Sequence, residues 1–372
     1  MLISINIMAQ YAGNANYTLF QDEFDVLGRT WSKNTYTESS GKWRAYFKGE
    51  SVTHGAAERQ AYQRSQCLFD TNDNMMLLVS DYVSHTDLDC NDIEIPSYEG
   101  CKIDTSYHIR YFSGALQSIT PSFLYGYFEI RCKMPVHRGA FPAFWLYNSK
   151  NSGSDPFYEE IDIFEYSWGI ASESQNPDSH GDGDSRCYTM GMYYSNVGHP
   201  GVLTQCSVAK IYSRVSDYSP SMNDWNTFGC LWMPDKVEWY LNGQMVNSYY
   251  NVDSIPHHPL YIMVNYAIDS YSMSKNNQIV YYTGTDTMYI DYIRAYRPIW
   301  DCGTSVLIEE QSDLDNYEHG IKSSVTINPN DPIIVDYTDK IDIMSSGTVT
   351  INAPFIVEAG SRFSVAIQQC PE

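Results

Sequence analysis

Short runs of apolar, β-branched and aromatic residues recur along most of this chain, separated by turn-forming residues. Clear examples lie at residues 236–241, 259–267 and 288–296. Such residues favour strands, and Gly, Pro, Asn and Asp favour the turns between strands. Asn242-Gly243 is the strongest hairpin signal in the chain. No long stretch has helical periodicity, so the sequence predicts an all-β protein, a sandwich or jelly roll.

The pattern of individual strands adds detail to this prediction. Apolar and more polar side chains alternate over residues 125–135, which predicts a half-buried antiparallel strand. Residues 141–147 are apolar throughout, as in a central strand, and residues 67–79 read as a hairpin around a turn at 71–74. We predict one domain over 17–298. Residues 299–372 form a linker, at 304–320, and a small C-terminal β module.

Charge and cysteine content limit the compartment and the partners. The formal net charge of −22 argues against nucleic acid and anionic membranes, and mildly against a heavily sulfated substrate unless a local basic patch is present. The chain has no apolar run of 18 residues, and residues 1–16 are interpreted as a possible remnant of a secretion signal with an N-terminal tail. We therefore expect a secreted, periplasmic or cell-surface protein, without a transmembrane segment.

Nine cysteines are present, and none form a C-x-x-C pair, so a zinc ribbon is not expected. Three lie in apolar strand patterns, where a thiol is usually a small buried hydrophobe: Cys67, Cys132 and Cys230. The other six form candidate disulfides, which suggests an oxidising compartment: Cys90/Cys101, Cys187/Cys206 and Cys302/Cys370.

The stretch Glu160-Ile161-Asp162-Ile163-Phe164-Glu165 holds three carboxylates among strand-forming residues. On a regular strand Glu160 and Asp162 share one face and Glu165 takes the other. A β-bulge between Asp162 and Glu165 would bring all three acids to one face. Crowding would then separate their pKa values, and retaining glycoside hydrolysis needs an ionised carboxylate beside a protonated one. The alternative is the solvated face of an ordinary antiparallel strand.

The acidic stretch resembles the E-x-D-x-x-E signature of glycoside hydrolase family 16. Segments at 113–131 and 141–146 resemble the family's lead-in to this strand, and segments at 225–232, 237–243, 260–265 and 290–296 resemble its later strands in the same order. The resemblance covers about residues 17–298. It implies a β-jelly-roll of two curved antiparallel sheets with a cleft across the concave face. It also implies retaining endo-hydrolysis of a β-linked glycan.

The resemblance also implies roles for individual residues. Glu160 would be the nucleophile, Glu165 the general acid/base, and Asp162 would tune their protonation. Trp145 would be the sugar platform next to the cleaved bond, with core packing as the alternative reading. Glu23 and Asp291 resemble positions near a structural calcium site, although both also read as ordinary surface acids. No cofactor is expected for catalysis, and the partner is a polysaccharide bound by a monomer.

Further substrate contacts are interpretations that the sequence leaves open. Trp43, Tyr166 and Trp168 are weaker platform candidates, which read equally well as loop or core residues. Arg44 and Arg138, with His137, would form a local basic patch for a sulfate or uronate; the alternative is a set of solvated cations.

The substrate itself stays open between a β-glucan and a β-galactan, including the red-algal kind. Asn226 stands where family members often have His, which argues against a simple β-1,3-glucanase. A transglycosylase on the same scaffold and a non-catalytic glycan-binding jelly roll are the two alternative functions.

Overall fold

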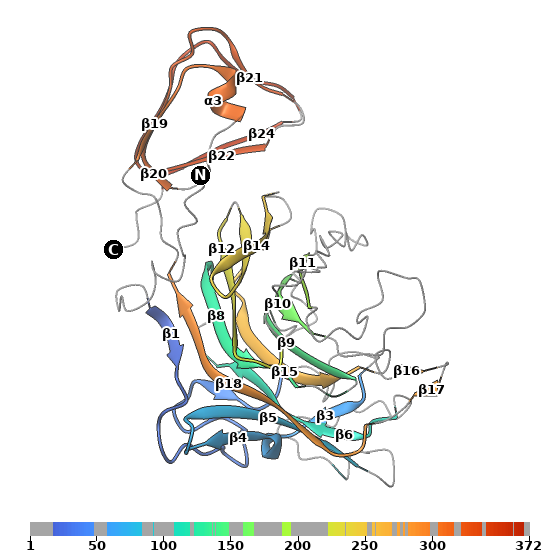
Figure 1. Cartoon of the computed structure of the whole chain (residues 1–372). Coiled ribbons are helices and arrows are strands. Elements are labelled where there is room, and N and C mark those ends of the chain that lie inside the picture. Colours follow the sequence, from blue (N-terminus) through green and yellow to red (C-terminus); the bar gives the residue numbers. More distant parts are fainter. Residues whose placement is uncertain are drawn as a thin grey trace. The chain divides into compact units, whose positions relative to one another are not determined.

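The computed structural model of the chain divides into two compact units. The first holds Met1–Trp232, Val237–Tyr249 and Ser254–Arg297; the second holds Met233–Lys236, Tyr250–Asp253 and Pro298–Glu372 (Figure 1). The structure describes residues 18–47, 58–83, 92, 108–119, 123–135, 137, 139–148, 159–166, 188–194, 222–234, 236–250, 255–256, 258–269, 274–275, 278–279, 282–297, 304–315, 321–336, 340–359 and 361–367. Within these residues, no helix is both long and apolar enough to cross a bilayer.

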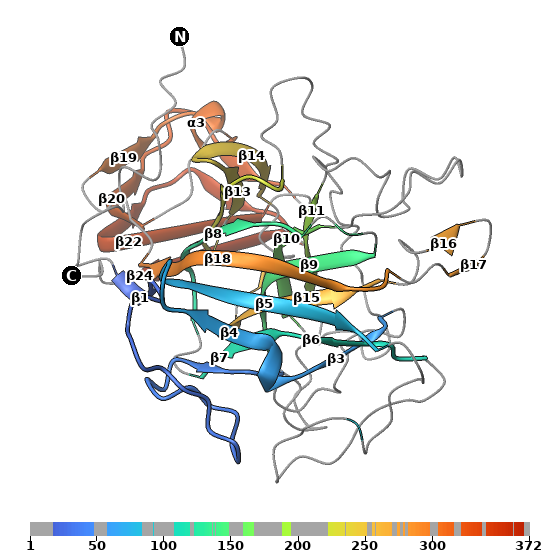
Figure 2. The same ribbon diagram turned by 60° about the horizontal axis from the view of Figure 1, so that its bottom comes forward.

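A ten-stranded sheet forms one layer of the first unit. Its main path runs β14 (Gln244–Tyr249), β13 (Val237–Leu241), β12 (Asn226–Trp232), β8 (Gly126–Lys133), β18 (Thr285–Tyr296), β5 (Met75–Tyr82), β6 (Tyr111–Ser113) and β3 (Gln60–Tyr62). Off this path, β1 (Thr18–Asp22) pairs with β18 and β4 (Cys67–Asp70) pairs with β5. All pairs are antiparallel except β3–β6. Figure 2 shows β8, β18 and β5 side by side.

A six-stranded antiparallel sheet forms the other layer. Its order is β11 (Thr189–Tyr194), β10 (Glu159–Glu165), β9 (Ala140–Tyr147), β15 (Tyr261–Ile268), β7 (Ala115–Ser118) and β2 (Trp43–Arg44). A short helix, η2 (Arg64–Gln66), precedes β4, and β16 (Ser274–Lys275) pairs with β17 (Gln278–Ile279). The acidic stretch of the sequence is β10, next to the edge of this sheet.

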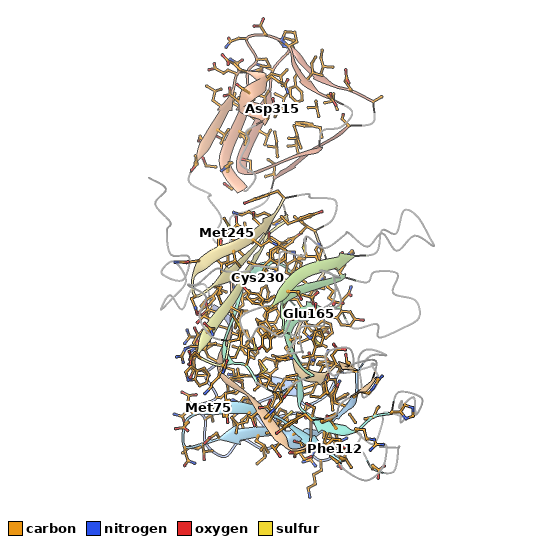
Figure 3. The ribbon with its side chains drawn as sticks, turned by 45° about the vertical axis from the view of Figure 1, so that its right-hand side comes forward. Met75, Phe112, Glu165, Cys230, Met245 and Asp315 are labelled. Carbon is orange, nitrogen blue, oxygen red and sulfur yellow. The ribbon has the colours of Figure 1, made fainter. Side chains whose placement is uncertain are left out.

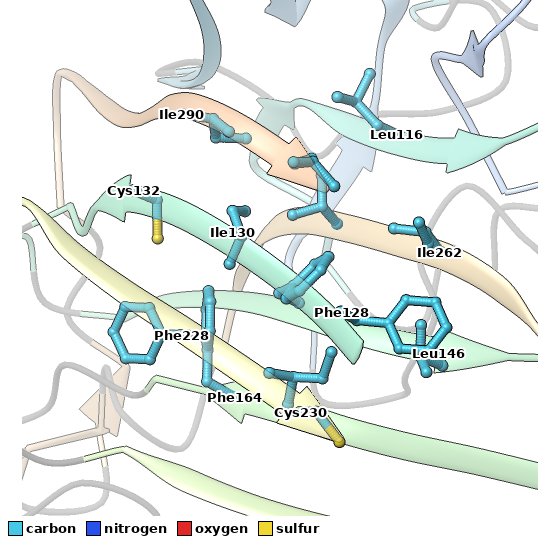
Figure 4. Packing of buried hydrophobic residues seen from close by; sticks show 14 of the residues in the cluster. Leu116, Phe128, Ile130, Cys132, Leu146, Phe164, Phe228, Cys230, Ile262 and Ile290 are labelled. Carbon is cyan, nitrogen blue, oxygen red and sulfur yellow. The ribbon is translucent and has the colours of Figure 1, made fainter. Parts of the chain in front are cut away.

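The main core lies between the two sheets. Phe128 and Ile130 of β8 belong to the same buried cluster as Phe144 of β9 and Phe164 of β10 (Figure 4). Phe164 also packs against Phe228 of β12, with ring centroids 4.6 Å apart. Because each sheet buries one face against the other, the unit is an all-β sandwich, as the sequence predicts.

Local signals in the sequence are confirmed where the structure describes them. β4 and β5 form the predicted hairpin. Asn242 and Gly243 have φ angles of 51° and 78° between β13 and β14, as a hairpin turn with two left-handed residues requires. Cys67, Cys132 and Cys230 are buried free thiols, and burial raises the pKa of Cys67 to about 12. The six cysteines of the candidate disulfides lie outside the described residues, as do residues 1–16.

The prediction that β8 is only half buried is wrong. Phe128, Ile130 and Cys132 face the main core, but Tyr127 and Glu129 on the opposite face are each only 1% exposed. Tyr127 and Tyr292 donate hydrogen bonds to the two carboxylate oxygens of Glu129, at 3.0 and 2.8 Å. A carboxylate held in this way can be buried without leaving its oxygens unpaired, so alternation alone overestimated the solvent exposure.

The second unit is built from parallel strands with a separate core. β19 (Ser305–Ile308), β20 (Ile321–Ile327), β22 (Lys340–Ile351) and β24 (Arg362–Ile367) form one parallel sheet; β21 (Ile333–Val335) and β23 (Phe355–Val357) pair in another. Residues 305–308 and helix α3 (Gln311–Asp315) belong to this unit and contribute buried Ile308 and Leu314. The prediction of a linker over all of 304–320 is therefore wrong, because this segment supplies part of the core.

Candidate active site

The predicted bulge is present in β10. Toward β11, Asp162 pairs with Gly191 and Glu165 with Thr189, so three steps along β10 oppose two along β11. Toward β9, Asp162 pairs with Trp145 and Phe164 with Phe144, which again leaves one extra residue on β10. The bulge lets Ile161, Ile163 and Phe164 all enter the main core, at 0–1% exposure.

As a result, the three acids share the sheet face opposite the core. Glu165 pairs with Ala143 and Asp162 with Trp145, and these two partners stand two positions apart on β9. Glu160 pairs with Tyr147, two positions further along β9. Residues two apart on a strand point to the same side, so Glu160, Asp162 and Glu165 line one surface. Glu165, the last residue of β10, is labelled in Figure 3.

Glu159, the fourth acid of the stretch, is kept away from this surface. Its carboxylate accepts a hydrogen bond from the backbone N–H of His258 at 2.8 Å, and the Nδ1 atom of His258 lies 2.9 Å from the other oxygen. Its own backbone N–H donates to the side-chain oxygen of Asn148 at 2.9 Å. Glu159 therefore fixes the start of β10, and its carboxylate does not join the three acids of the shared face.

Asp162, the middle acid of the three, has a raised pKa. It is 3% exposed, and burial raises its pKa well above the usual value; the charges of Glu165 and Glu160, and a hydrogen bond with Glu160, raise it further. A protonated Asp162 can donate that hydrogen bond to an ionised Glu160. Burial and the two neighbouring carboxyl groups thus favour the protonated form of Asp162.

Trp145 lies on the same face as the acids and outside the main core. It belongs to a second buried cluster with Phe47, Tyr62, Tyr147 and Met263. Its indole N–H donates to the side-chain oxygen of Asn265 at 2.8 Å, and the amide nitrogen of Asn265 donates to the Tyr62 hydroxyl at 2.9 Å. These two hydrogen bonds fix the plane of the indole beside Asp162.

Asn265, Tyr62 and Phe47 are residues of the face that the sequence analysis missed. A signal did exist for Asn265, because it is the one amide in the otherwise apolar run 259–267. No comparable signal exists for Tyr62 and Phe47, which come from distant parts of the chain. Phe47 packs edge-on against Trp145 with ring centroids 5.6 Å apart.

Two of the predicted sugar platforms are core residues instead. Trp43 is 0% exposed in the main core, and its indole N–H donates to Asp22 at 2.7 Å. Arg29 clamps the same carboxylate with two bonds of 2.7 Å. Tyr166 is also 0% exposed in the main core. Neither ring presents a surface to a sugar, and Trp168 and Arg138 lie outside the described residues.

The two residues assigned to a calcium site are held by arginines. Arg294 clamps Glu23 through two hydrogen bonds of 2.7 Å, and Arg131 bonds Asp291. Within the described ranges, no group of three or more His, Cys, Asp or Glu side chains is placed to hold a metal ion. The geometry at Glu23 and Asp291 is that of two separate ion pairs.

Comparison with known proteins shows which proteins this chain is similar to. The sequence pattern of "Glycosyl hydrolases family 16" matches residues 71–294. An endo-1,3-1,4-beta-glycanase of Rhizobium meliloti is 29% identical over 203 residues, 54% of this chain and 36% of that protein. A kappa-carrageenase of Pseudoalteromonas carrageenovora is 26% identical over 237 residues, 61% of this chain and 49% of that protein. This chain thus matches less than half the length of each.

Solved structures share the fold of the first unit at low sequence identity. A laminarinase catalytic domain from Thermotoga maritima aligns with a TM-score of 0.50 and 19% identity, over 76% of this chain and 98% of that domain. A beta-porphyranase from Bacteroides plebeius aligns with a TM-score of 0.50 and 21% identity, over 76% and 90%. At this identity the likeness concerns the jelly-roll fold alone.

Proposed function

This chain belongs to glycosyl hydrolases family 16, and we propose that it is a retaining, endo-acting glycoside hydrolase of a β-linked polysaccharide. The observation that carries the proposal is the bulge of β10, which gathers Glu160, Asp162 and Glu165 on one face. Retaining hydrolysis needs two carboxyl groups about 5 Å apart, one ionised and one protonated. The position of Glu160 and Glu165 on the same face of β10 supports the proposal.

In the proposed first step, the ionised Glu160 attacks the anomeric carbon of the sugar. The bond to the leaving oxygen breaks as Glu165 donates its proton to that oxygen, which leaves a glycosyl ester on Glu160. Asp162 stays protonated through its burial and donates a hydrogen bond to Glu160, which stabilises the ionised form before attack. Trp145, which Asn265 holds beside Asp162 and which is 4% exposed, is the ring proposed to meet the sugar.

In the second step, Glu165 takes a proton from water. The oxygen of that water attacks the anomeric carbon and releases Glu160, so two inversions give net retention. A sugar hydroxyl in place of water would give transglycosylation on the same residues. Products longer than the substrate, detected by mass spectrometry, would identify that outcome.

The proposal names a β-linked polysaccharide without specifying its sugar or its linkage. The relatives reported above are named as an endo-1,3-1,4-beta-glycanase, a kappa-carrageenase, a laminarinase and a beta-porphyranase, so their names do not converge on one linkage. A polysaccharide substrate is too large to enter cells intact, and we therefore also propose a secreted or cell-surface location.

Rescue of two alanine variants by azide tests the roles separately. With an activated aryl glycoside, Glu160→Ala loses its nucleophile, and azide attacks directly to give a glycosyl azide of inverted configuration. Glu165→Ala still forms the ester, and azide replaces water to give the azide of retained configuration. We expect each variant to lose about 100- to 10,000-fold or more in kcat without azide.

Asp291→Ala is the matched control, because it removes a carboxylate on the other sheet that is bound to Arg131. It should keep normal turnover and give no azide product. Normal turnover by Glu160→Ala, or azide products of the same configuration from both variants, would refute the assignment.

A further inference from the structure

Arg44 has no ionic partner among the residues that the structure describes. Its Nε atom is buried and has no hydrogen-bond partner, and among the described residues no carboxylate lies within ion-pair distance of its guanidinium. The ring of Tyr46 lies near its guanidinium. The ring centroid is 5.9 Å from Cζ, at the outer limit of a cation–π contact. A guanidinium has five donors, and leaving a buried one unpaired is costly.

Three other arginines among the described residues are bound by carboxylates. Arg29 is bound by Asp22 and Glu38, Arg131 by Asp291, and Arg294 by Glu23. In a chain with 45 acids and 23 basic residues, an arginine finds a carboxylate easily. An arginine that pairs with no carboxylate of the described residues suits an anion that comes from outside the chain.

Strand pairing places Arg44 on the face of the three acids. Asp162 pairs with Trp145, Trp145 with Met263, Met263 with Gln117, and Gln117 with Arg44, so these five residues form one row across the sheet. Residues paired across strands point to the same side. Trp43, next to Arg44, enters the main core, which independently places Arg44 on the opposite face.

Charge is separated along this row. The strands of the six-stranded sheet contain four carboxylates, all on β10, and a single basic residue, Arg44 on the edge strand β2. Four strand spacings separate Asp162 from Arg44, or roughly 19 Å. The three residues between them, Trp145, Met263 and Gln117, are buried. Arg44 at one end of the sheet and Glu165 on β10 at the other are partly exposed.

We propose that Arg44 binds an anionic substituent of the glycan, a sulfate or a carboxylate, at a subsite several sugars from the cleaved bond. This inference rests on the proposed function, because it takes the acid face as the site of cleavage. A glycan that crosses the strands from β10 to β2 brings a remote sugar to Arg44. The planar guanidinium matches either anion with two parallel hydrogen bonds.

The overall charge explains why such a site is needed. A net charge of −22 repels a polyanion, so an anionic glycan gains little from the field of the whole protein. One unpaired arginine at short range overcomes this repulsion at a single subsite. It therefore selects a glycan with a substituent at one position rather than any dense polyanion.

A cycle of protein and substrate changes tests the proposal. Wild type and Arg44→Gln are compared on porphyran and κ-carrageenan oligosaccharides before and after chemical desulfation, and on a glucuronic acid-bearing β-glycan before and after carboxyl reduction. For the anion that Arg44 binds, wild type should lose about 10- to 100-fold in kcat/KM when the anion is removed, mainly through KM. When the anion is removed, the Arg44→Gln variant should lose less than about threefold in kcat/KM, because the guanidinium that binds the anion is already absent.

Two further variants keep the result interpretable. Arg44→Lys keeps the charge but not the planar fork, and should retain an intermediate preference for the anionic glycan. Arg131→Gln removes an arginine from the other sheet and should respond to anion removal as wild type does. Equal losses in wild type and Arg44→Gln on every substrate pair would overturn the proposal. A wild-type preference for the neutral glycan would do the same.

Binding measurements separate this proposal from the proposed function. Calorimetry of Glu160→Gln against Glu160→Gln/Arg44→Gln with the same oligosaccharides needs no turnover. If no glycan is cleaved but the second variant binds the anionic glycan about 10-fold more weakly, the hydrolase proposal fails and the Arg44 site stands. If cleavage follows the azide rescue pattern and both variants bind the anionic and neutral glycans alike, only the Arg44 site fails.

Discussion

Replacing Asp162 by asparagine should make the protein more stable, and the gain should grow as the pH rises. Burial, the charges of Glu165 and Glu160 and the hydrogen bond with Glu160 all raise the pKa of Asp162 above its ordinary value of 3.8. Asparagine keeps the shape and can still donate a hydrogen bond toward Glu160, but it has no proton to lose. The variant therefore isolates the electrostatic cost of this one carboxyl group.

The size of the effect follows from proton linkage. Below about pH 4 the carboxyl is protonated in both the folded and the unfolded chain, and its full contribution to stability is present. Above about pH 5 the unfolded chain has lost this proton and the folded chain keeps it, so the free energy of unfolding falls by about 1.4 kcal/mol per pH unit. The fall continues until the pH reaches the raised pKa of the folded state.

The Asp162→Asn protein escapes this loss. Between pH 5 and pH 7 its stability relative to wild type should increase by up to about 2.7 kcal/mol, which corresponds to roughly 5 °C in Tm for a domain of this size. Scanning calorimetry at half-unit pH steps measures the difference. Asp291→Asn, on the other sheet, is the control for the loss of one acid from a chain of net charge −22. A Tm difference that stays constant or shrinks from pH 5 to pH 7 would refute the reasoning.

Two further changes probe the support of the site and the sheet behind it. Asn265→Leu should lower the free energy of unfolding by about 1–3 kcal/mol, because the Trp145 indole and the Tyr62 hydroxyl lose a buried partner. It should also raise KM, as Trp145 is no longer held in one plane; an unchanged KM with a lower Tm would show that the contact is structural only. Gly229→Ala should cost about 1–3 kcal/mol in urea unfolding, because its Cβ would lie 2.8 Å from Cζ of the buried Tyr127 ring. Tyr127 is anchored to Glu129 and cannot move away easily, so wild-type stability in this variant would contradict the packing described for β8.

Several features of the fold and the site were readable from local sequence. The alternation of side chains, the Asn242-Gly243 turn and the absence of helical periodicity depend on neighbouring residues, so they predict strands, one hairpin and an all-β fold correctly. The position of the bulge was also readable. The stretch from Glu160 to Glu165 combines acids and apolar residues in an order that a regular strand could not satisfy on both faces.

Other features depend on contacts between distant segments and were not readable. Glu129 is buried because Tyr292, 163 residues away in sequence, donates to it. Trp43 can be a core residue because Asp22, itself held by Arg29, accepts the hydrogen bond of its indole nitrogen. The pattern of residues around Trp43 is the same for an exposed platform and for a core ring. Only the packing of β1 and β2 distinguishes the two.

The sequence by itself therefore determined the class of fold, the three acids and the need for a bulge, because backbone geometry and side-chain alternation act over a few residues. Only the tertiary structure decided that burial raises the pKa of Asp162, that Trp145 rather than Trp43 lies beside the acids, and that Arg44 meets no carboxylate among the described residues. Burial raises the pKa of Asp162, and Asp162 is buried only in the folded protein. The row from Asp162 to Arg44 joins five strands from separate parts of the chain, and its register exists only when the sheet is assembled.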